Sequence, residues 1–217
     1  MSKGRCALYN RPMIPTYWLE ASEALASVDP HMAELVARYQ GASLASRGDP
    51  FATLARSIVG QQISVKAADA VWTRFVERVG EVSPARVGAL GRDGLAGCGL
   101  SQRKIEYVSD LARHFSSGQL DPQKWPTLDD EAIIDELATV RGIGRWTAEM
   151  FLIFNLMRPD VYPLDDIGLQ RAVFVRYFGG EKQPRRVLAE FGDRWRPWRS
   201  VATWYLWRSL DPIPVEY

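Results

Sequence analysis

The chain has 217 residues, of which 47% are apolar and 24% charged, and its formal net charge is +1 at pH 7. This length allows one domain or two lobes that share a core, and the near-neutral charge argues against a strongly basic nucleic-acid binder. The two cysteines, Cys6 and Cys98, have no metal-binding or disulfide spacing, and the sequence lacks both a signal peptide and an apolar run of about 18 residues, so we expect an intracellular, soluble protein.

The predicted elements are all helices. Apolar residues recur every three or four positions along most of the chain, and no run alternates as a half-buried strand would. Residues 1–16 are expected to be irregular, because Pro12 and Pro15 interrupt any pattern. The predicted segments are 18–39 with a break near Asp29-Pro30, 49–80 as two helices meeting near Gly60, 82–90, 99–118, 126–140, 146–157, 167–178, 184–195 and 198–210. We expect an all-α protein of roughly nine or ten helices with short loops.

Polar residues and glycine predict where several of these helices begin and end. Ser83, Ser101 and Thr127 are expected N-caps, because their hydroxyl oxygens can accept hydrogen bonds from free N–H groups. Asp130 follows Thr127 at nearly the spacing of a capping box. Gly80 is expected to end its helix as a C-cap.

Basic residues are concentrated near the C-terminus. Residues 171–208 contain nine Lys and Arg but three acidic residues. Charge alone leaves two interpretations open, a basic binding surface or a solvated face of mixed charge.

The stretch Val140-Arg-Gly-Ile-Gly144 lies between two predicted helices. Glycine permits positive φ and close approach of another backbone, and the start of the following helix offers free N–H groups to a phosphate oxygen. A tight helix–helix turn is the alternative explanation of two closely spaced glycines. The longer pattern V-x-G-I-G-x-x-T-A is typical of a helix–hairpin–helix motif, which binds the DNA backbone without reading sequence. The expected backbone-binding residues are Gly142, Gly144, Arg145 and Thr147.

Five separated motifs resemble the helix–hairpin–helix DNA glycosylases, and among them the bacterial 3-methyladenine DNA glycosylase II family. They are SIVGQQISVKAA (57–68), GLSQRKIEYV (99–108), LATVRGIGRWTAEMF, YPLDDIGLQRA and RWRPWRSVATWYLW (194–207). The resemblance spans residues 17–211, with the motif itself at 128–158. It implies a two-lobed helical fold with the active-site cleft between the lobes. It also implies a compact member of the family, without the separate N-terminal β domain of longer members.

Two departures from related enzymes indicate a monofunctional glycosylase. Bifunctional relatives carry a lysine nucleophile two residues after the second hairpin glycine, whereas this sequence has Trp146, so no Schiff base and no strand-nicking step are expected. Relatives with an iron–sulfur cluster need four cysteines that this sequence lacks. No organic cofactor is expected.

Two adjacent aspartates, Asp165 and Asp166, precede the helix predicted at 167–178. The resemblance assigns catalysis to Asp166, which is followed five residues later by Arg171 as in the family pattern. A carboxylate here can stabilise the positive charge that develops on the sugar when an N-glycosidic bond breaks. Asp165 is expected to cap the helix as structural support. Arg171 is expected to anchor the structure through a nearby ion pair, with a phosphate contact as the alternative.

The resemblance also places a base-binding pocket and a DNA wedge. Trp146 and Trp207 would line the pocket, where an aromatic ring attracts a cationic base, and Met150 and Ile167 stand where relatives can carry tyrosines. Ordinary core packing is the alternative for both tryptophans. Gln62 occupies the position that fills the gap left by a flipped base, although it could instead serve a turn.

In the family, hairpin carbonyls hold a monovalent cation, and the matching positions are Ala138, Val140 and Ile143. The resemblance further implies a monomer that binds double-stranded DNA containing a damaged base, with no membrane partner. It would act in the bacterial cytoplasm at the nucleoid, or in the nucleus of a eukaryote. The function expected is removal of alkylated purines such as 3-methyladenine and 7-methylguanine to begin base-excision repair. A catalytically inactive DNA-binding module and a glycosylase for deaminated or oxidised bases remain as alternatives.

Overall fold

The structure is a computed structural model that describes residues 14–46 and 48–210. Most of the segment predicted to be irregular, residues 1–16, therefore lies outside the described residues, as do Cys6 and the predicted end of the domain at position 211. Residues 14–16 form no helix.

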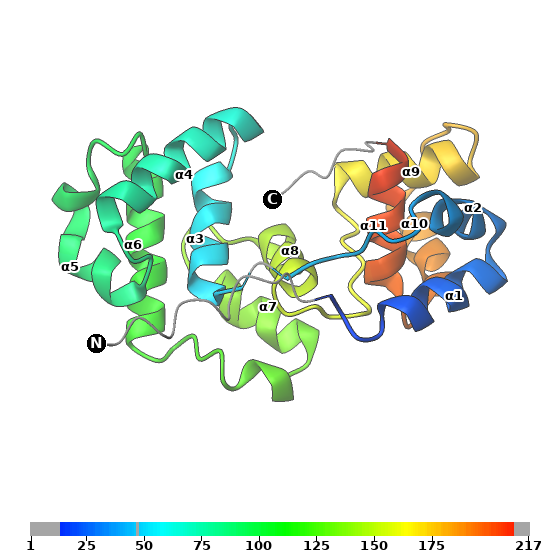
Figure 1. The fold of residues 1–217 in the computed structure, drawn as a ribbon, viewed down its shortest axis with the longest axis horizontal. Coiled ribbons are helices and arrows are strands. Elements are labelled where there is room, and N and C mark those ends of the chain that lie inside the picture. The colour runs from blue at the N-terminus through cyan, green and yellow to red at the C-terminus, as the bar shows by residue number, and fades with distance from the viewer. Residues whose placement is uncertain (1–13, 47, 211–217) are drawn as a thin grey trace. The chain divides into compact units, whose positions relative to one another are not determined.

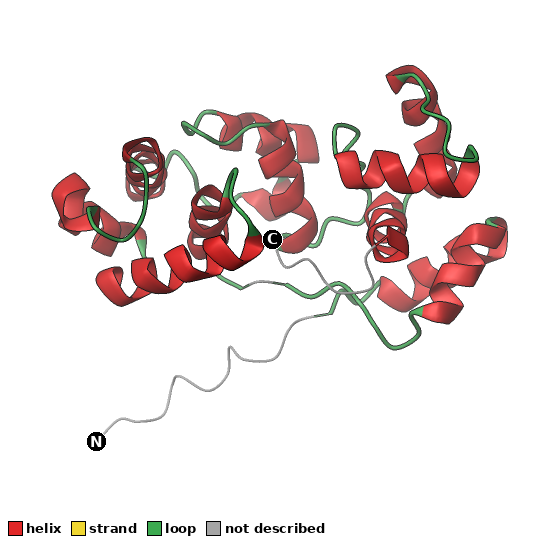
Figure 2. Cartoon of the chain, turned by 90° about the horizontal axis from the view of Figure 1, so that it is seen from above, coloured by secondary structure: helices red, strands yellow, loops and turns green. Residues whose placement is uncertain are grey.

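Helices make up all the regular structure of the described residues, as Figure 2 shows, and this confirms the predicted all-α class. The nine predicted segments contain eleven α-helices, because two of them hold a break, so the expected total of nine or ten was too low. The helices are α1 (Trp18–Val28), α2 (Pro30–Arg38), α3 (Pro50–Gly60), α4 (Val65–Val79), α5 (Pro84–Leu95), α6 (Gln102–Ser116), α7 (Asp130–Ala138), α8 (Arg145–Phe154), α9 (Ile167–Tyr177), α10 (Arg185–Gly192) and α11 (Arg199–Leu210). Two short 3-10 helices, η1 (Trp125–Thr127) and η2 (Asp193–Trp195), complete the described part.

The chain divides into two compact units, as the resemblance implied. Within the described residues, unit 1 comprises 14–46 and 152–210, and unit 2 comprises 48–151. In Figure 1, unit 1 contains the blue helices α1 and α2 and the yellow-to-red helices α9 to α11, whereas unit 2 contains the cyan and green helices α3 to α7. The boundary between the units falls inside α8.

Unit 1 is built on α11, which packs against α9, α2 and α1. The buried carboxylate of Asp29 connects further segments of unit 1. Asp29 caps α2, and its Oδ2 accepts hydrogen bonds from the Tyr177 hydroxyl (2.9 Å) and from Trp195 Nε1 (3.0 Å). The predicted break near Asp29-Pro30 is therefore a capped helix start. Trp195 is fully buried, so core packing accounts for this tryptophan.

Unit 2 packs α3 and α5 against α6, and α4 against α3 and α5. Its core contains a chain of edge-to-face rings in which Phe115 contacts Phe51 and Trp125, and Trp125 contacts Phe151. Such pairs stabilise a core beyond the area that they bury.

Most predicted helix ends are confirmed, with Ser83 and Ser101 as N-caps and Gly80 as a C-cap. Thr127 was wrongly expected to cap the helix at 126–140. The chain turns through η1 first, and Asp129 caps α7 by accepting a hydrogen bond from Ala132 N (2.8 Å).

Two predicted helices end earlier than expected. The helix at 146–157 stops at Phe154, shortly before Met157 adopts a φ of 55°. The helix at 184–195 stops at Gly192, whose backbone lies against the Tyr162 ring, and continues as η2.

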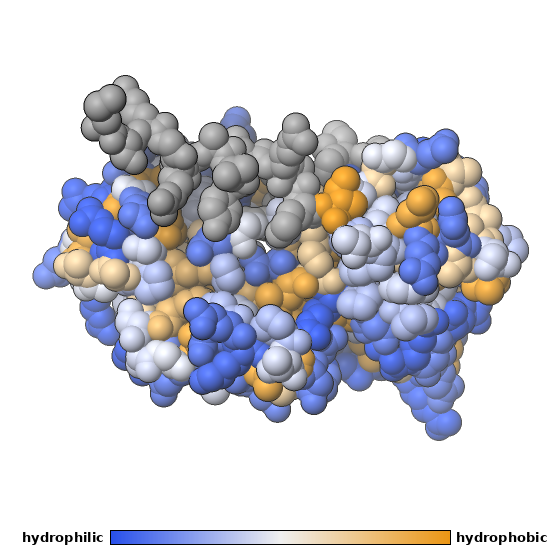
Figure 3. Space-filling view, turned by 60° about the horizontal axis from the view of Figure 1, so that its bottom comes forward, coloured by the Kyte–Doolittle hydropathy of each residue, from blue (hydrophilic) through white to orange (hydrophobic). Residues whose placement is uncertain are grey.

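The charged residues near the C-terminus form a surface of mixed charge. Five of the nine basic residues at 171–208 pair with acidic partners: Arg176, Arg185, Arg186, Arg196 and Arg199. Hydrophilic residues also predominate on the face of the molecule in Figure 3. No helix among the described residues is long and apolar enough to cross a membrane.

Candidate functional site

Asp166 is the N-cap of α9, and it is 6% exposed. Its Oδ1 accepts hydrogen bonds from Leu169 N (2.6 Å) and from Trp207 Nε1 (2.8 Å) on α11. Its backbone is extended (φ −75°, ψ 117°), as a residue that precedes a helix requires. A buried carboxylate is thus oriented by one donor from its own helix and one from a neighbouring helix.

The expected capping role of Asp165 is wrong. The side chain of Asp165 is exposed and forms an ion pair with Arg185 on α10 (Oδ1 to Nε, 3.0 Å). The helix begins one residue later than a cap at Asp165 would need, so Asp166 takes the cap position. The resemblance distinguished the two carboxylates by assigning catalysis to Asp166, whereas the cap was expected at the wrong one.

Trp207 and Gly168 shape the surroundings of Asp166. The Trp207 ring stacks on Phe154 at the end of α8, with centroids 5.8 Å apart and an interplanar angle of 10°. A Cβ atom at Gly168 would lie 3.1 Å from Asp166 Oδ1 and 3.3 Å from Trp207 Cδ1. The lack of a side chain at Gly168 therefore lets the indole reach the carboxylate. No role was predicted for Gly168, although a glycine in the first turn of a helix is unfavourable and is itself a signal.

Ile167 and Arg171 both point away from the core of unit 1. Ile167 is 80% exposed, beside the buried Asp166. Arg171 is exposed and makes no hydrogen bond or ion pair with any described residue. The expected ion pair of Arg171 is therefore absent among the described residues, and the side chain is exposed on α9.

The predicted hairpin lies between α7 and α8. Ile143 N donates to the Val140 carbonyl (3.1 Å), which closes the turn, and Gly142 has a φ of 88°. A Cβ atom at Gly142 would lie 2.1 Å from Cδ2 of Tyr107, which packs on the turn from α6. Gly144 has an ordinary φ and open space where its Cβ would be. Backbone conformation and the Tyr107 ring thus both require glycine at position 142, whereas neither requires it at position 144.

The hairpin is also held by Asp110 on α6. Its Oδ2 accepts a hydrogen bond from Arg141 N (3.0 Å). Burial opposes ionisation of Asp110, but hydrogen bonds from Arg141 N and the Arg113 guanidinium outweigh it and lower the pKa of the carboxyl. The turn therefore depends on a charged acceptor from another helix.

Arg145, the first residue of α8, lies in a network of carboxylates. Its guanidinium pairs with Glu131 on α7 (Nη1 to Oε2, 2.8 Å) and with Glu149 one turn along α8 (Nε to Oε1, 3.1 Å). The hydrogen bond to Glu131, with the charge of Glu149, raises the pKa of Arg145. A phosphate would compete with these carboxylates for the side chain, whereas it could still meet the backbone at the start of α8. Thr147 is buried.

The loop between α3 and α4 carries Gln62 at its exposed tip, where Gln62 has a φ of 59°. Such a conformation is uncommon for a residue other than glycine and often marks a functional loop. The preceding Gln61 donates its side-chain amide to the Gly142 carbonyl (2.8 Å), which ties this loop to the hairpin. No role was predicted for Gln61, because a contact with a residue 81 positions further along the chain leaves no local pattern.

The expected pocket residues lie in different units. Trp146, half-buried, and Met150, buried, belong to unit 2 together with the hairpin and Gln62. Ile167 and Trp207 belong to unit 1 with Asp166. Within unit 1, Trp207 contacts Asp166 directly, so core packing alone does not describe it.

Among the described residues, no group of three or more His, Cys, Asp or Glu side chains could hold a metal ion. A site formed by backbone carbonyls, as expected at Ala138, Val140 and Ile143, would need none of these side chains.

Comparisons with known proteins point to one group. The family described as "HhH-GPD superfamily base excision DNA repair protein" matches residues 55–197. A Bacillus subtilis protein named putative DNA-3-methyladenine glycosylase YfjP is 34% identical over 164 residues, which cover 72% of this chain. The chain spans 57% of the length of that relative.

Two solved structures extend the comparison to the fold. A DNA-3-methyladenine glycosidase from Bacillus halodurans has a TM-score of 0.79 and 33% identity, with 93% of each chain covered. The 3-methyladenine DNA glycosylase Mag1 of Schizosaccharomyces pombe, solved in complex with abasic DNA, has a TM-score of 0.75 and 29% identity, with 88% of this chain and 96% of Mag1 covered.

Proposed function

Because the chain belongs to the HhH-GPD superfamily of base excision DNA repair proteins, we propose that it is a monofunctional DNA glycosylase for alkylated purines. It flips bases of the 3-methyladenine and 7-methylguanine type out of duplex DNA and hydrolyses their N-glycosidic bond. The observation that carries the proposal is the buried Asp166 carboxylate, oriented by Leu169 N and Trp207 Nε1. Similar proteins are named DNA-3-methyladenine glycosylases or glycosidases, which supports alkylated purines as the substrate class.

The proposed chemistry needs one carboxylate. An alkylated purine is cationic and leaves with the electron pair of the C1′–N bond, so positive charge develops on the sugar. Asp166 stabilises this charge and accepts a proton from the attacking water, whose oxygen bonds to C1′. With Trp146 where a lysine nucleophile would stand, the product is an intact abasic strand.

The hairpin supplies the grip on the DNA backbone in this proposal. The open space around Gly144 and the positive end of the helix dipole at the start of α8 accommodate a phosphate oxygen. The charge of Arg145 is largely satisfied by Glu131 and Glu149, so the backbone amides contribute more than the side chain.

We propose that aromatic rings bind the flipped base, with Trp207 beside Asp166 and Ile167 in unit 1, and with Trp146 and Met150 in unit 2. Gln62, exposed at the tip of its loop, enters the gap that the base leaves.

We also propose that hairpin carbonyls bind a monovalent cation. Arg141 N donates to Asp110, so this amide does not occupy the Ala138 carbonyl at the end of α7. The Val140 carbonyl accepts one hydrogen bond from Ile143 N and keeps a second lone pair, and the Ile143 carbonyl would complete the set. Replacing potassium by lithium should weaken binding to undamaged duplex if such a cation contributes.

The enzyme is further proposed to act as a monomer where DNA is found, in the cytoplasm or the nucleus.

The test is an excision assay on a panel of single-lesion duplexes that contain alkylated, deaminated or oxidised bases. Asp166→Asn should abolish release of alkylated purines and keep affinity for abasic-site DNA, whereas the neighbouring Asp165→Asn should behave as wild type. Full activity in Asp166→Asn would refute the mechanism. Binding to abasic DNA without release of any base would instead indicate an inactive DNA-binding module.

A further inference from the structure

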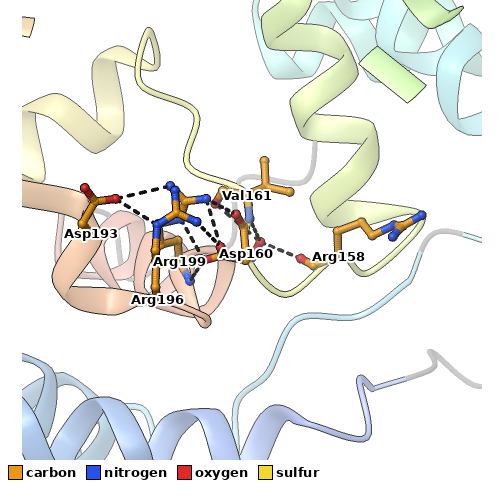
Figure 4. Close-up of polar contacts among 7 residues, drawn as sticks. Arg158, Asp160, Val161, Asp193, Arg196 and Arg199 are labelled. Atoms are coloured by element: carbon orange, nitrogen blue, oxygen red, sulfur yellow. Dashed lines mark hydrogen bonds and ion pairs between the residues drawn. The ribbon is translucent and has the colours of Figure 1, made fainter. Parts of the chain in front are cut away.

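The segment between α8 and α9, residues 155–166, ends at Asp166, and its middle is fixed to the start of α11. Ser200, fully buried on α11, donates its hydroxyl to the Arg158 carbonyl (2.6 Å) and accepts from Val161 N (2.9 Å). Ser200 N donates to the Pro159 carbonyl (3.0 Å). Figure 4 shows Arg158 and Val161 in this group of polar contacts.

Asp160 strengthens the same attachment. Its Oδ1 accepts from Arg199 Nε (2.8 Å) and its Oδ2 from Arg199 Nη2 (3.0 Å), a two-point contact that fixes geometry as well as charge. Arg196 donates to Oδ2 of Asp160 (2.8 Å) and to Oδ1 of Asp193 (2.9 Å). In Figure 4 the two arginines lie between Asp193 and Asp160, and the Asp193 carboxylate pairs with both of them.

These contacts and the catalytic contact share one helix. Ser200 and Trp207 are seven residues apart, which is two turns of α11, so they share a face and lie about 10 Å apart along the axis. The bond from Leu169 N to Asp166 is internal to the start of α9, so it cannot fix where that start lies against α11. That position depends on the packing of α9 against α11, on Trp207 and on the attachment of residues 158–161.

We infer that Ser200 and Asp160 are positioning residues that set the register of residues 158–166 along α11, and so place the Asp166 carboxylate for reaction. The inference rests on the proposed function. Misplacement of a reacting group by about 1 Å can cost on the order of a hundredfold in rate. Binding of DNA to the hairpin of unit 2 uses none of these residues, so rate and affinity should respond separately.

The experiment compares Asp160→Asn and Ser200→Ala with two matched controls, Asp193→Asn in the same network and Ser209→Ala on the same helix. Ser209 donates to Leu206 O within α11 and does not contact the segment. Single-turnover excision of an alkylated purine and the Kd for a duplex with a non-cleavable abasic analogue are measured well below each variant's melting temperature.

Asp160→Asn and Ser200→Ala should lose at least about tenfold in excision rate, with Kd within about twofold of wild type. Both controls should stay near wild type. Rates equal to those of the controls, or parallel losses of rate and affinity, would overturn the inference. If Ser200→Ala does not fold, Asp160→Asn alone tests the inference. In that variant Arg196 and Arg199 still have Asp193 as an ion-pair partner. A wild-type protein that excises no base would overturn the proposed function and this inference together, whereas an active wild type with a fully active Asp160→Asn would overturn the inference alone.

Discussion

Replacing each hairpin glycine by alanine should have different effects, although the two glycines look equivalent in the sequence. Gly142 has a φ of 88°, and alanine in the left-handed region costs about 1–2 kcal/mol. Its Cβ would also lie 2.1–2.6 Å from three atoms of the Tyr107 ring, which must shift at a cost of about 1–3 kcal/mol. Gly142→Ala should therefore destabilise the protein by roughly 2–5 kcal/mol.

Gly144 has neither constraint, since its φ is ordinary and nothing lies within 4 Å of an added Cβ. Gly144→Ala should change the stability by no more than about 0.5 kcal/mol. If a phosphate approaches this open space, however, the same variant should lose affinity for duplex DNA. The pair therefore separates a packing role at Gly142 from a binding role at Gly144.

Urea unfolding and thermal melting measure the first effect, and fluorescence anisotropy with an undamaged duplex measures the second. For a chain of this length, a loss of 1 kcal/mol lowers Tm by about 2–4 °C, so Gly142→Ala should melt roughly 4–20 °C below wild type. Equal Tm losses in the two variants would refute the packing argument. Unchanged DNA affinity in Gly144→Ala would remove the backbone contact from this position.

Three further predictions concern neighbouring contacts. Trp207→Phe keeps an aromatic ring but removes the Nε1–H donor to Asp166. The single-turnover rate should therefore fall by about tenfold or more, while the affinity for abasic-site DNA changes less. An unchanged rate would refute the orienting role of Trp207. Gln61→Leu should speed amide hydrogen exchange in the hairpin and weaken duplex binding several-fold, whereas Gln102→Leu on the exposed start of α6 should do neither. Because the pKa of Asp110 is lowered in the folded state, its contribution to stability is present above the unfolded pKa of about 3.9 and is lost as pH falls below it. The protection of the Arg141 amide, which is the intrinsic exchange rate divided by the observed rate at the same pH, should therefore fall in acid, and Asp110→Ala should weaken that pH dependence.

Local patterns predicted the helices and most of their caps, because apolar period and capping chemistry act within a few residues. The same information could not separate Asp165 from Asp166 as the cap, since the answer depends on where α9 begins to within one residue. It also could not show that Arg145 is held by Glu131, because the turn of the hairpin brings together residues 14 positions apart.

Contacts between distant segments were beyond the reach of sequence patterns for the same reason. The bond from Gln61 to the hairpin and the attachment of Ser200 to the segment before α9 each join elements that only the tertiary fold brings together. The resemblance to a family supplied the role of Asp166, whereas the fold supplied the neighbours that orient it, Trp207 and Gly168.

The N-cap position of Asp166 decides which substitution can test its chemistry. Alanine would remove the acceptor for Leu169 N, which costs about 1 kcal/mol of stability, and the acceptor for Trp207 Nε1–H. A loss of activity in Asp166→Ala could therefore reflect a displaced start of α9. Asparagine caps helices as well as aspartate does, and its side-chain oxygen can accept both hydrogen bonds. Asp166→Asn thus removes the negative charge while keeping the geometry. If this variant matches wild type in Tm and in affinity for abasic DNA but releases no base, the missing charge accounts for the loss.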